Sequence, residues 1–179
     1  MNEKDFKILE NIFLTSSSSE ELFDAFDTAL KGNIGDLEIY KILLANPALS
    51  IEEIEMYVKI LSQKFPSIKY DLFMWAAFIF ETYTHVSEYL EKATEYYAKA
   101  ADMDFSNCEP YISMLKNYDY DLKLPVNKTI TNFIESRLNL IKCKSKIYSA
   151  LAKHYGKLGD GKKKAKYLEL YEKAVREEN

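Results

Sequence analysis

A helical motif that recurs five times constrains the fold of this chain more than any other feature of its sequence. In each copy an aromatic residue is followed by apolar or small residues three or four positions later, usually with a second aromatic residue beyond them. The leading aromatic residues lie 34, 33, 38 and 37 residues apart and are Phe6, Tyr40, Phe73, Tyr111 and Tyr148. Residues at such spacings share one face of an α-helix, and a fixed period of this size is typical of stacked helical repeats. The motif therefore predicts an all-α fold.

Each copy is followed by a second helical pattern with an apolar stripe at positions i, i+4 and i+7. The five stripes begin at Leu22, Ile54, Ala93, Ile134 and Tyr167. Each pair of patterns therefore predicts a helical hairpin, and we expect ten helices, over residues 3–14, 18–31, 36–46, 50–64, 68–84, 87–102, 107–118, 127–142, 144–158 and 161–177. Nothing near Cys143 breaks a helix, so residues 127–158 also fit one continuous helix.

Composition supports long helices with short connections. Apolar residues make up 47% of the chain and charged residues 29%, which is enough for a buried core, and one domain over residues 1–179 is the natural expectation. Five glycines and four prolines provide little material for the turns of an all-β fold. Ser17–Glu20 and Ser50–Glu53 both match the capping box of a helix start. Turns are expected at residues 31–33, 119–125 and 159–161.

Two of the five hairpins resemble the tetratricopeptide repeat. The resemblance covers about residues 70–104 and 145–178, and the other three hairpins keep the apolar spacing but lose the small residues. In the last hairpin the matching residues are an aromatic, Leu, a small residue, a Tyr, a Leu-Gly-Asp turn and an aromatic-x-x-Ala second helix: Tyr148, Leu151, Ala152, Tyr155, 158–160, Tyr171 and Ala174. The resemblance implies a right-handed superhelix of about five antiparallel hairpins, whose first helices line a concave groove.

The same resemblance implies which side chains would line that groove. Carried over by register, the groove residues are Met74, Trp75, Phe78, Lys116, Tyr120, Lys146, Ser149, Lys153 and Lys157. Aromatic and thioether groups with lysines at one end suit a peptide or helix that has an acidic segment. We therefore expect an adaptor or co-chaperone-like scaffold that binds a protein partner. The alternative for Trp75 and Phe78 is burial by neighbouring helices.

Charge is distributed unevenly along the chain. Residues 121–179 hold 14 lysine and arginine residues against 7 aspartate and glutamate residues, whereas residues 1–120 hold 10 against 21. Between positions 142 and 166 the chain has nine lysines and a single acidic residue, Asp160. This pattern leaves two further hypotheses open, namely binding of a polyanion such as RNA or an anionic membrane, and head-to-tail self-association into a homo-oligomer. The acidic sequence pI of about 5.4 and the shortage of arginine argue against nucleic acid.

The sequence offers little material for catalysis. Neither His85 nor His154 has a Cys, Asp or Glu at ligand spacing, and both are expected to be ordinary surface or half-buried residues. No nucleotide-binding, metalloprotease or hydrolase motif occurs, so we expect a non-enzyme without cofactor or metal. Cys108 and Cys143 fall outside any CxxC motif, which favours free thiols.

Location is predicted from hydropathy and from the same cysteines. The most apolar stretch, Leu72–Phe80, has nine residues, whereas about 20 are needed to span a bilayer. The first residues lack the pattern of a secretory signal. The sequence therefore predicts a cytoplasmic protein without a transmembrane segment.

Overall fold

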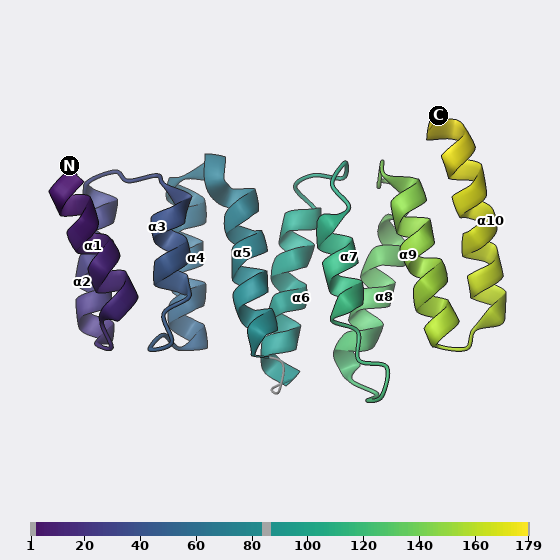
Figure 1. Ribbon diagram of the computed structural model, residues 1–179, viewed down its shortest axis with the longest axis horizontal. Coiled ribbons are helices and arrows are strands. Elements are labelled where there is room, and N and C mark those ends of the chain that lie inside the picture. The colour runs from purple at the N-terminus through teal and green to yellow at the C-terminus, as the bar shows by residue number, and fades with distance from the viewer. Residues whose placement is uncertain (1–2, 84–86, 179) are drawn as a thin grey trace. The chain divides into compact units, whose positions relative to one another are not determined.

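The computed structural model describes residues 3–83 and 87–178, which are all-helical (Figure 1). In these residues the chain forms ten α-helices and one short 3₁₀ helix, and no strand. The elements are α1 (Glu3–Thr15), α2 (Ser19–Lys31), α3 (Leu37–Leu44), α4 (Ile51–Lys64), η1 (Pro66–Ile68), α5 (Lys69–Thr82), α6 (Ser87–Ala101), α7 (Glu109–Lys116), α8 (Pro125–Arg137), α9 (Lys144–Lys157) and α10 (Gly161–Glu178). The all-α prediction is confirmed. His85 lies outside the described residues.

The helices α8 and α9 are separate, which answers the question left open by the sequence. Helix α8 ends at Arg137, five residues before the predicted end. The amide of Ile141 still donates to the carbonyl of Arg137, at 3.1 Å, but the amide of Lys142 donates to the carbonyl of Phe105, at 2.9 Å. The backbone thus leaves the helix because a neighbouring loop supplies its hydrogen-bond acceptor.

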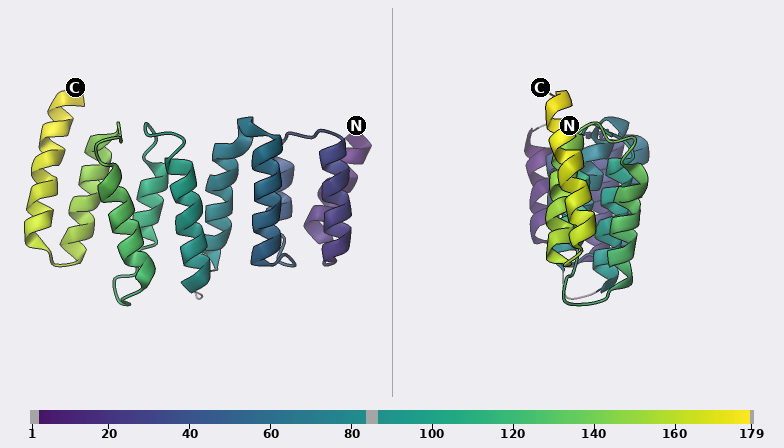
Figure 2. Two further views of the ribbon diagram at one scale, coloured as in Figure 1. Left: turned by 180° about the vertical axis from the view of Figure 1, so that it is seen from behind. Right: turned by 90° about the vertical axis from the view of Figure 1, so that its right-hand side faces the viewer.

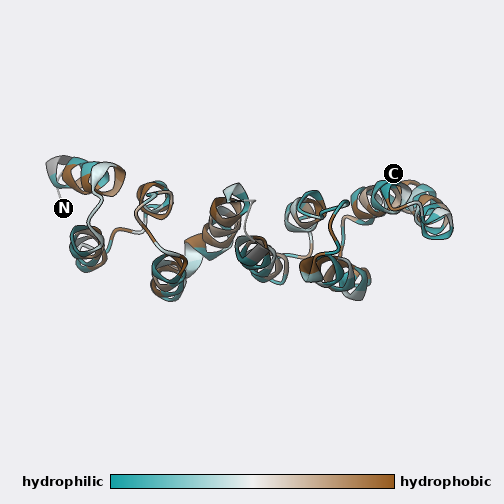
Figure 3. Ribbon diagram, turned by 90° about the horizontal axis from the view of Figure 1, so that it is seen from below, coloured by the Kyte–Doolittle hydropathy of each residue, from teal (hydrophilic) through white to brown (hydrophobic). Residues whose placement is uncertain are grey.

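The chain forms two compact units, Met1–Ile79 and Phe80–Asn179. Unit 1 contains α1 to α4, η1 and most of α5, and unit 2 contains the end of α5 and α6 to α10. In both units the helices carry hydrophobic and hydrophilic residues on different faces (Figure 3). Apolar faces of this kind are removed from water only when they pack against one another, so each hairpin needs a neighbour.

The core of unit 1 contains three aromatic residues in contact: Tyr40, which leads a motif, Phe26, which belongs to a stripe, and Tyr57 of α4. Phe26 lies 4.5 Å from the ring of Tyr57 and 6.1 Å from the ring of Tyr40, between ring centroids. All three side chains are buried, and the hydroxyl of Tyr40 donates to the carbonyl of Ile34 at 2.6 Å. Aromatic pairs at these separations contribute beyond the area they bury.

Helix starts follow the capping expectations with one shift. Ser50 and Glu53 form the predicted capping box at the start of α4. At the start of α2 the prediction of Ser17 was wrong, because Ser18 is the N-cap and accepts from the amide of Glu21. Ser16 takes up the other end of this turn by donating to the carboxylate of Glu21, at 2.6 Å.

In unit 2, stacked aromatic rings join consecutive helices. Phe80 lies 5.6 Å from Tyr96, and Tyr155 lies 5.6 Å from Tyr167, in both cases with nearly parallel rings. The second pair joins α9 to α10, which lie antiparallel and side by side (Figures 1 and 2). Asn127 is buried and bonds the backbone of the preceding loop at Asp119 and Leu122, which fixes the loop that carries Tyr120.

The sixth residue after a leading aromatic is called the junction position; in three hairpins it is polar and bonds to the hairpin before it, and after Phe73 it is the buried Ile79. Asn46 donates to the carbonyls of Phe13 and Ser16, at 2.8 and 2.9 Å, within unit 1. In unit 2, Asn117 donates to the carboxylate of Glu81 at 3.2 Å. His154, the junction residue of α9, lies 2.9 Å from the hydroxyl of Tyr120. Polar side chains thus bridge successive hairpins at equivalent places.

The two cysteines form a disulfide, so the expectation of free thiols was wrong. Cys108 and Cys143 are bonded to each other, with their Cα atoms 6.2 Å apart. Each precedes a first helix, α7 and α9 respectively, and these two helices pack together. The cysteines are 35 residues apart, close to one repeat, and this equivalence is what brings them side by side. The pairing also removes one of the grounds for the predicted cytoplasmic location, because disulfides persist mainly in oxidising compartments.

Hydropathy of the helices agrees with the expectation drawn from the apolar stretches. Among residues 3–83 and 87–178, no helix combines the length and the apolar character that crossing a membrane requires.

Candidate functional site

The predicted groove residues of unit 1 lie on the side of α5 that faces away from the core. Phe78 is 45% exposed, and Met74 and Trp75 are half-buried, whereas Ala76 and Ala77 are fully buried. The ring centroids of Trp75 and Phe78 are 5.3 Å apart. Neither aromatic side chain is therefore enclosed in the core, which was the alternative that the sequence left open.

Trp75 is held in place by the end of α3. Its indole N–H donates to the carbonyl of Lys41 at 3.1 Å, and the ammonium of Lys41 lies 5.4 Å from the centre of the ring. The same carbonyl also accepts from the amide of Ala45 at 3.1 Å, so the indole uses its second acceptor position. The half-exposed ring is thus fixed in orientation, as a contact residue needs to be.

Three predicted groove residues of α9 lie together with residues of α10 around one hollow of about 480 Å³. We call it the α9–α10 hollow; it is lined by Ser149, Ala152, Lys153, Gly156 and Lys157 of α9 and by Lys164, Leu168 and Tyr171 of α10. Leu168 is 42% exposed and Tyr171 36% exposed. The hollow thus offers water-exposed apolar surface between two helices, where a partner side chain could be buried.

Lysines surround this apolar surface. Lys153, Lys157 and Lys164 are all exposed, and no acidic residue lines the hollow. Lys164 crosses α9 at Gly156, where a Cβ would lie 3.5 Å from its side chain. The ammonium of Lys157 lies 4.8 Å from the centre of the Tyr120 ring. An apolar floor with a cationic rim is suited to a partner that carries both carboxylates and apolar side chains.

The predicted groove residues Lys116 and Lys146 line a different hollow, next to the disulfide. This hollow of about 490 Å³ also includes Ile112 and the polar loop before α7. It contains the carboxylates of Asp104 and Glu109 as well as the two lysines, so its charge is mixed. The sequence predicted these lysines and those of the α9–α10 hollow as parts of one groove, whereas they line two hollows.

A half-buried polar cluster lies between α8 and the last hairpin. Glu135 accepts hydrogen bonds from the hydroxyls of Tyr155 and Tyr167, at 2.7 and 2.8 Å, and from the ammonium of Lys163, at 3.2 Å. Burial acts to raise the pKa of this carboxyl, but the three donors outweigh it and hold the pKa below its ordinary value. The charged carboxylate thus fastens α8 to α9 and α10.

His154 is buried, contrary to the expectation of a surface or half-buried residue. Its side chain is 2% exposed, and its ring packs against Tyr118 at 4.5 Å and Tyr155 at 5.0 Å. Nε2 is also buried and has no hydrogen-bond partner among the described residues. Burial lowers the pKa of His154 to about 4; Glu135 acts to raise it, and Lys157 and Lys163 act to lower it further. The imidazole is therefore neutral at pH 7.

Replacing His154 is expected to change how stability depends on pH. The unfolded chain takes up a proton near the ordinary pKa of 6.5, and folded His154 only near 4, so stability falls as pH falls through this window. One proton corresponds to a slope of at most about 1.4 kcal/mol per pH unit. In His154→Asn, which carries the junction residue of two other hairpins, this slope should disappear. Urea unfolding between pH 7 and 4 measures it, and an NMR titration of His154 with a midpoint near 6.5 would contradict the assignment.

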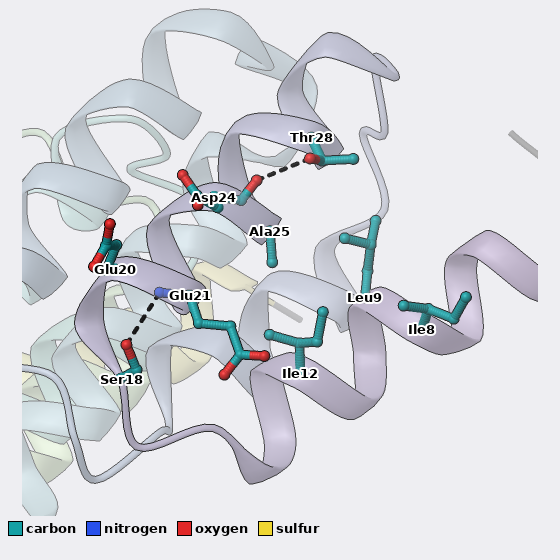
Figure 4. A pocket seen from close by; sticks show the side chains of 9 residues that line it. All are labelled: Ile8, Leu9, Ile12, Ser18, Glu20, Glu21, Asp24, Ala25 and Thr28. Carbon is teal, nitrogen blue, oxygen red and sulfur yellow. Dashed lines mark hydrogen bonds between the residues drawn. The ribbon is translucent and has the colours of Figure 1, made fainter.

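An acidic groove lies between α1 and α2 (Figure 4). Its floor consists of Ile8, Leu9 and Ile12 from α1, of which Leu9 and Ile12 project toward α2, and of Ala25 from α2. Glu20, Glu21 and Asp24 line it from α2, and all three are exposed. Ile8 is itself 50% exposed. We call this surface the α1–α2 groove; its charge is opposite to that of the α9–α10 hollow.

The sequence did not point to the α10 side of the hollow. Tyr171 was assigned to the packing stripe that begins at Tyr167, but it is 36% exposed, whereas Tyr167 and Ala174 of the same stripe are buried. Leu168 lies beside this stripe and received no role. The signal that could have found Leu168 is its register, since it follows the first stripe residue of its helix as Glu135 follows Ile134.

Over residues 3–83 and 87–178, no group of three or more His, Cys, Asp or Glu side chains is placed to bind a metal ion.

The chain was compared with families, characterised proteins and structures. No protein-family model, no curated protein and no solved structure matches it.

Proposed function

We propose that this chain is a non-catalytic protein-interaction module that binds a segment of a partner through the α9–α10 hollow. The observation that supports this best is the combination, in one hollow, of exposed Leu168 and Tyr171 with three lysines. The apolar side chains of a partner segment would bury Leu168 and Tyr171, and its carboxylates would neutralise the three lysines. Apolar contact provides affinity in such interfaces, and charge provides orientation and speed of association.

We further propose that the hairpins form a tetratricopeptide-like repeat array. Support comes from the residues at the two best-matching hairpins and from the position of the predicted groove residues, which lie on accessible sides of first helices in each unit, except for Tyr120 in the loop after α7. The fixed Trp75 and the exposed Phe78 would then form a second contact surface on unit 1.

Selection from a random peptide display library, with the whole chain immobilised, tests the proposal. Selected peptides should combine Asp or Glu with apolar residues, and their affinity should fall about tenfold or more in the double variant Lys153→Glu, Lys157→Glu. Tenfold corresponds to about 1.4 kcal/mol. The matched control is Lys162→Glu with Lys166→Glu, which makes the same charge change on α10 outside the hollow.

Three results would contradict the proposal. They are the absence of any selected peptide, binding that both double variants weaken equally, and binding that neither weakens. The polyanion hypothesis is separated by titrating labelled RNA at two salt concentrations, since binding that neutralises phosphates weakens steeply with salt.

A further inference from the structure

Helix α1 exposes, at its junction position, a residue that no hairpin covers among the described residues. Ile12 is the sixth residue after Phe6 and therefore corresponds to Ile79 and to three polar residues, Asn46, Asn117 and His154. Each of those three bonds to the hairpin before it. Ile12 is only half-buried and forms the floor of the α1–α2 groove. The groove is thus the surface that elsewhere in the chain receives a preceding hairpin.

The α9–α10 hollow is equivalent to the surface that, elsewhere in the chain, contacts the following hairpin. When the motifs that begin at Tyr111 and Tyr148 are aligned, Lys157 stands at the place of Tyr120, which bonds to His154 of the next hairpin. When the stripes of α8 and α10 are aligned, Leu168 stands at the place of Glu135, which bonds to Tyr155 and Tyr167 of the next hairpin. Both residues line the hollow and are exposed.

The two surfaces are complementary in charge as well as in their positions within the repeat. The α1–α2 groove carries Glu20, Glu21 and Asp24 around an apolar floor (Figure 4). The α9–α10 hollow carries three lysines around exposed Leu168 and Tyr171. Exposed charge pairs contribute little individually, so the apolar side chains would provide most of the contact, and the charges would select this pairing over like-with-like contacts.

We propose that the α1–α2 groove of one copy docks onto the α9–α10 hollow of a second copy. The first hairpin of one molecule then occupies the place that a following hairpin takes within the chain. Because the two surfaces differ, the contact is heterologous and leaves one free surface of each kind on every dimer. Association therefore continues into longer oligomers. The inference rests on the proposed function, since it names the occupant of the hollow.

Sedimentation velocity of the full chain and of two single variants tests the pairing. The wild type should form oligomers whose mass rises with protein concentration and falls with added salt, because salt screens the charges. Ile12→Asp disables the groove and Leu168→Asp disables the hollow, so each should raise the dissociation constant about tenfold or more. An equimolar mixture of the two variants should form dimers that do not grow, since each supplies the one surface that the other lacks.

Two matched controls place the same change outside the surfaces. Leu14→Asp on α1 and Leu140→Asp after α8 alter leucines that are 67% and 53% exposed and line neither surface. Both should associate as the wild type does. Circular dichroism of all four variants checks that they remain folded. We expect them to, because none of the four positions lies in the fully buried core.

Several outcomes would overturn the inference. They are a wild type that stays monomeric at every concentration and at low salt, a mixture of variants that stays monomeric, and oligomers that survive either single variant. The last result would indicate that the contact lies on another surface of the chain. A monomeric wild type whose hollow still binds selected acidic peptides would overturn self-association alone, whereas loss of both would remove the proposed function.

Discussion

Phe26→Ala should lower the free energy of unfolding of unit 1 by about 3–5 kcal/mol, the range for removing a buried phenylalanine. The ring is 1% exposed and lies between Tyr40 and Tyr57, so no solvent fills the space that it would leave. Whole domains are stable by about 5–15 kcal/mol, and the loss is therefore a large part of the total. Urea unfolding followed by circular dichroism measures it.

Phe23→Ala is the matched control, because Phe23 lies on the same helix and is 45% exposed. It should cost no more than about 1 kcal/mol, as most surface changes do. If Phe26→Ala leaves too little folded protein to measure, Phe26→Leu gives a smaller loss of the same kind. Equal losses for Phe23→Ala and Phe26→Ala would contradict the described core.

Reduction of the disulfide should lower the free energy of unfolding by about 4 kcal/mol. Cys108 and Cys143 are 35 residues apart, and the chain-entropy relation gives about this value for a closed loop of that length. Urea unfolding with and without dithiothreitol measures the change. Mass spectrometry after alkylation, without reduction, should find no free thiol in the native protein.

The double variant Cys108→Ser, Cys143→Ser provides the control for this measurement. It should unfold at the midpoint of the reduced wild type and should not respond to dithiothreitol. A wild-type midpoint that reduction leaves unchanged would contradict a stabilising bond between α7 and α9.

Local signals explain why most helices could be predicted from the sequence. The recurring aromatic motif sets the first helices, and Ser50 with Glu53 sets the start of α4 within its own turn. The end of α8 could not be predicted in this way. It depends on a hydrogen bond from Lys142 to the carbonyl of Phe105, a residue that lies far away in the sequence.

The candidate site was predictable only where it lies on a first helix. Ser149, Lys153 and Lys157 share one side of α9, and helical spacing alone brings them together. The role of Leu168 and Tyr171 could not be predicted, because their exposure depends on what covers α10, and no local pattern encodes that. The burial of His154 could not be predicted either, because it is imposed by Tyr118 and Tyr120 of the preceding hairpin.

The fixed indole of α5 has a consequence for observing this protein. Trp75 is the only tryptophan of the chain, and it belongs to unit 1. Intrinsic fluorescence excited at the red edge of the indole band therefore reports on the environment of unit 1 alone, and the tyrosines of unit 2 contribute almost nothing to it. The sequence thus carries a built-in optical label that distinguishes events in unit 1, including the melting of its helices, from events in unit 2.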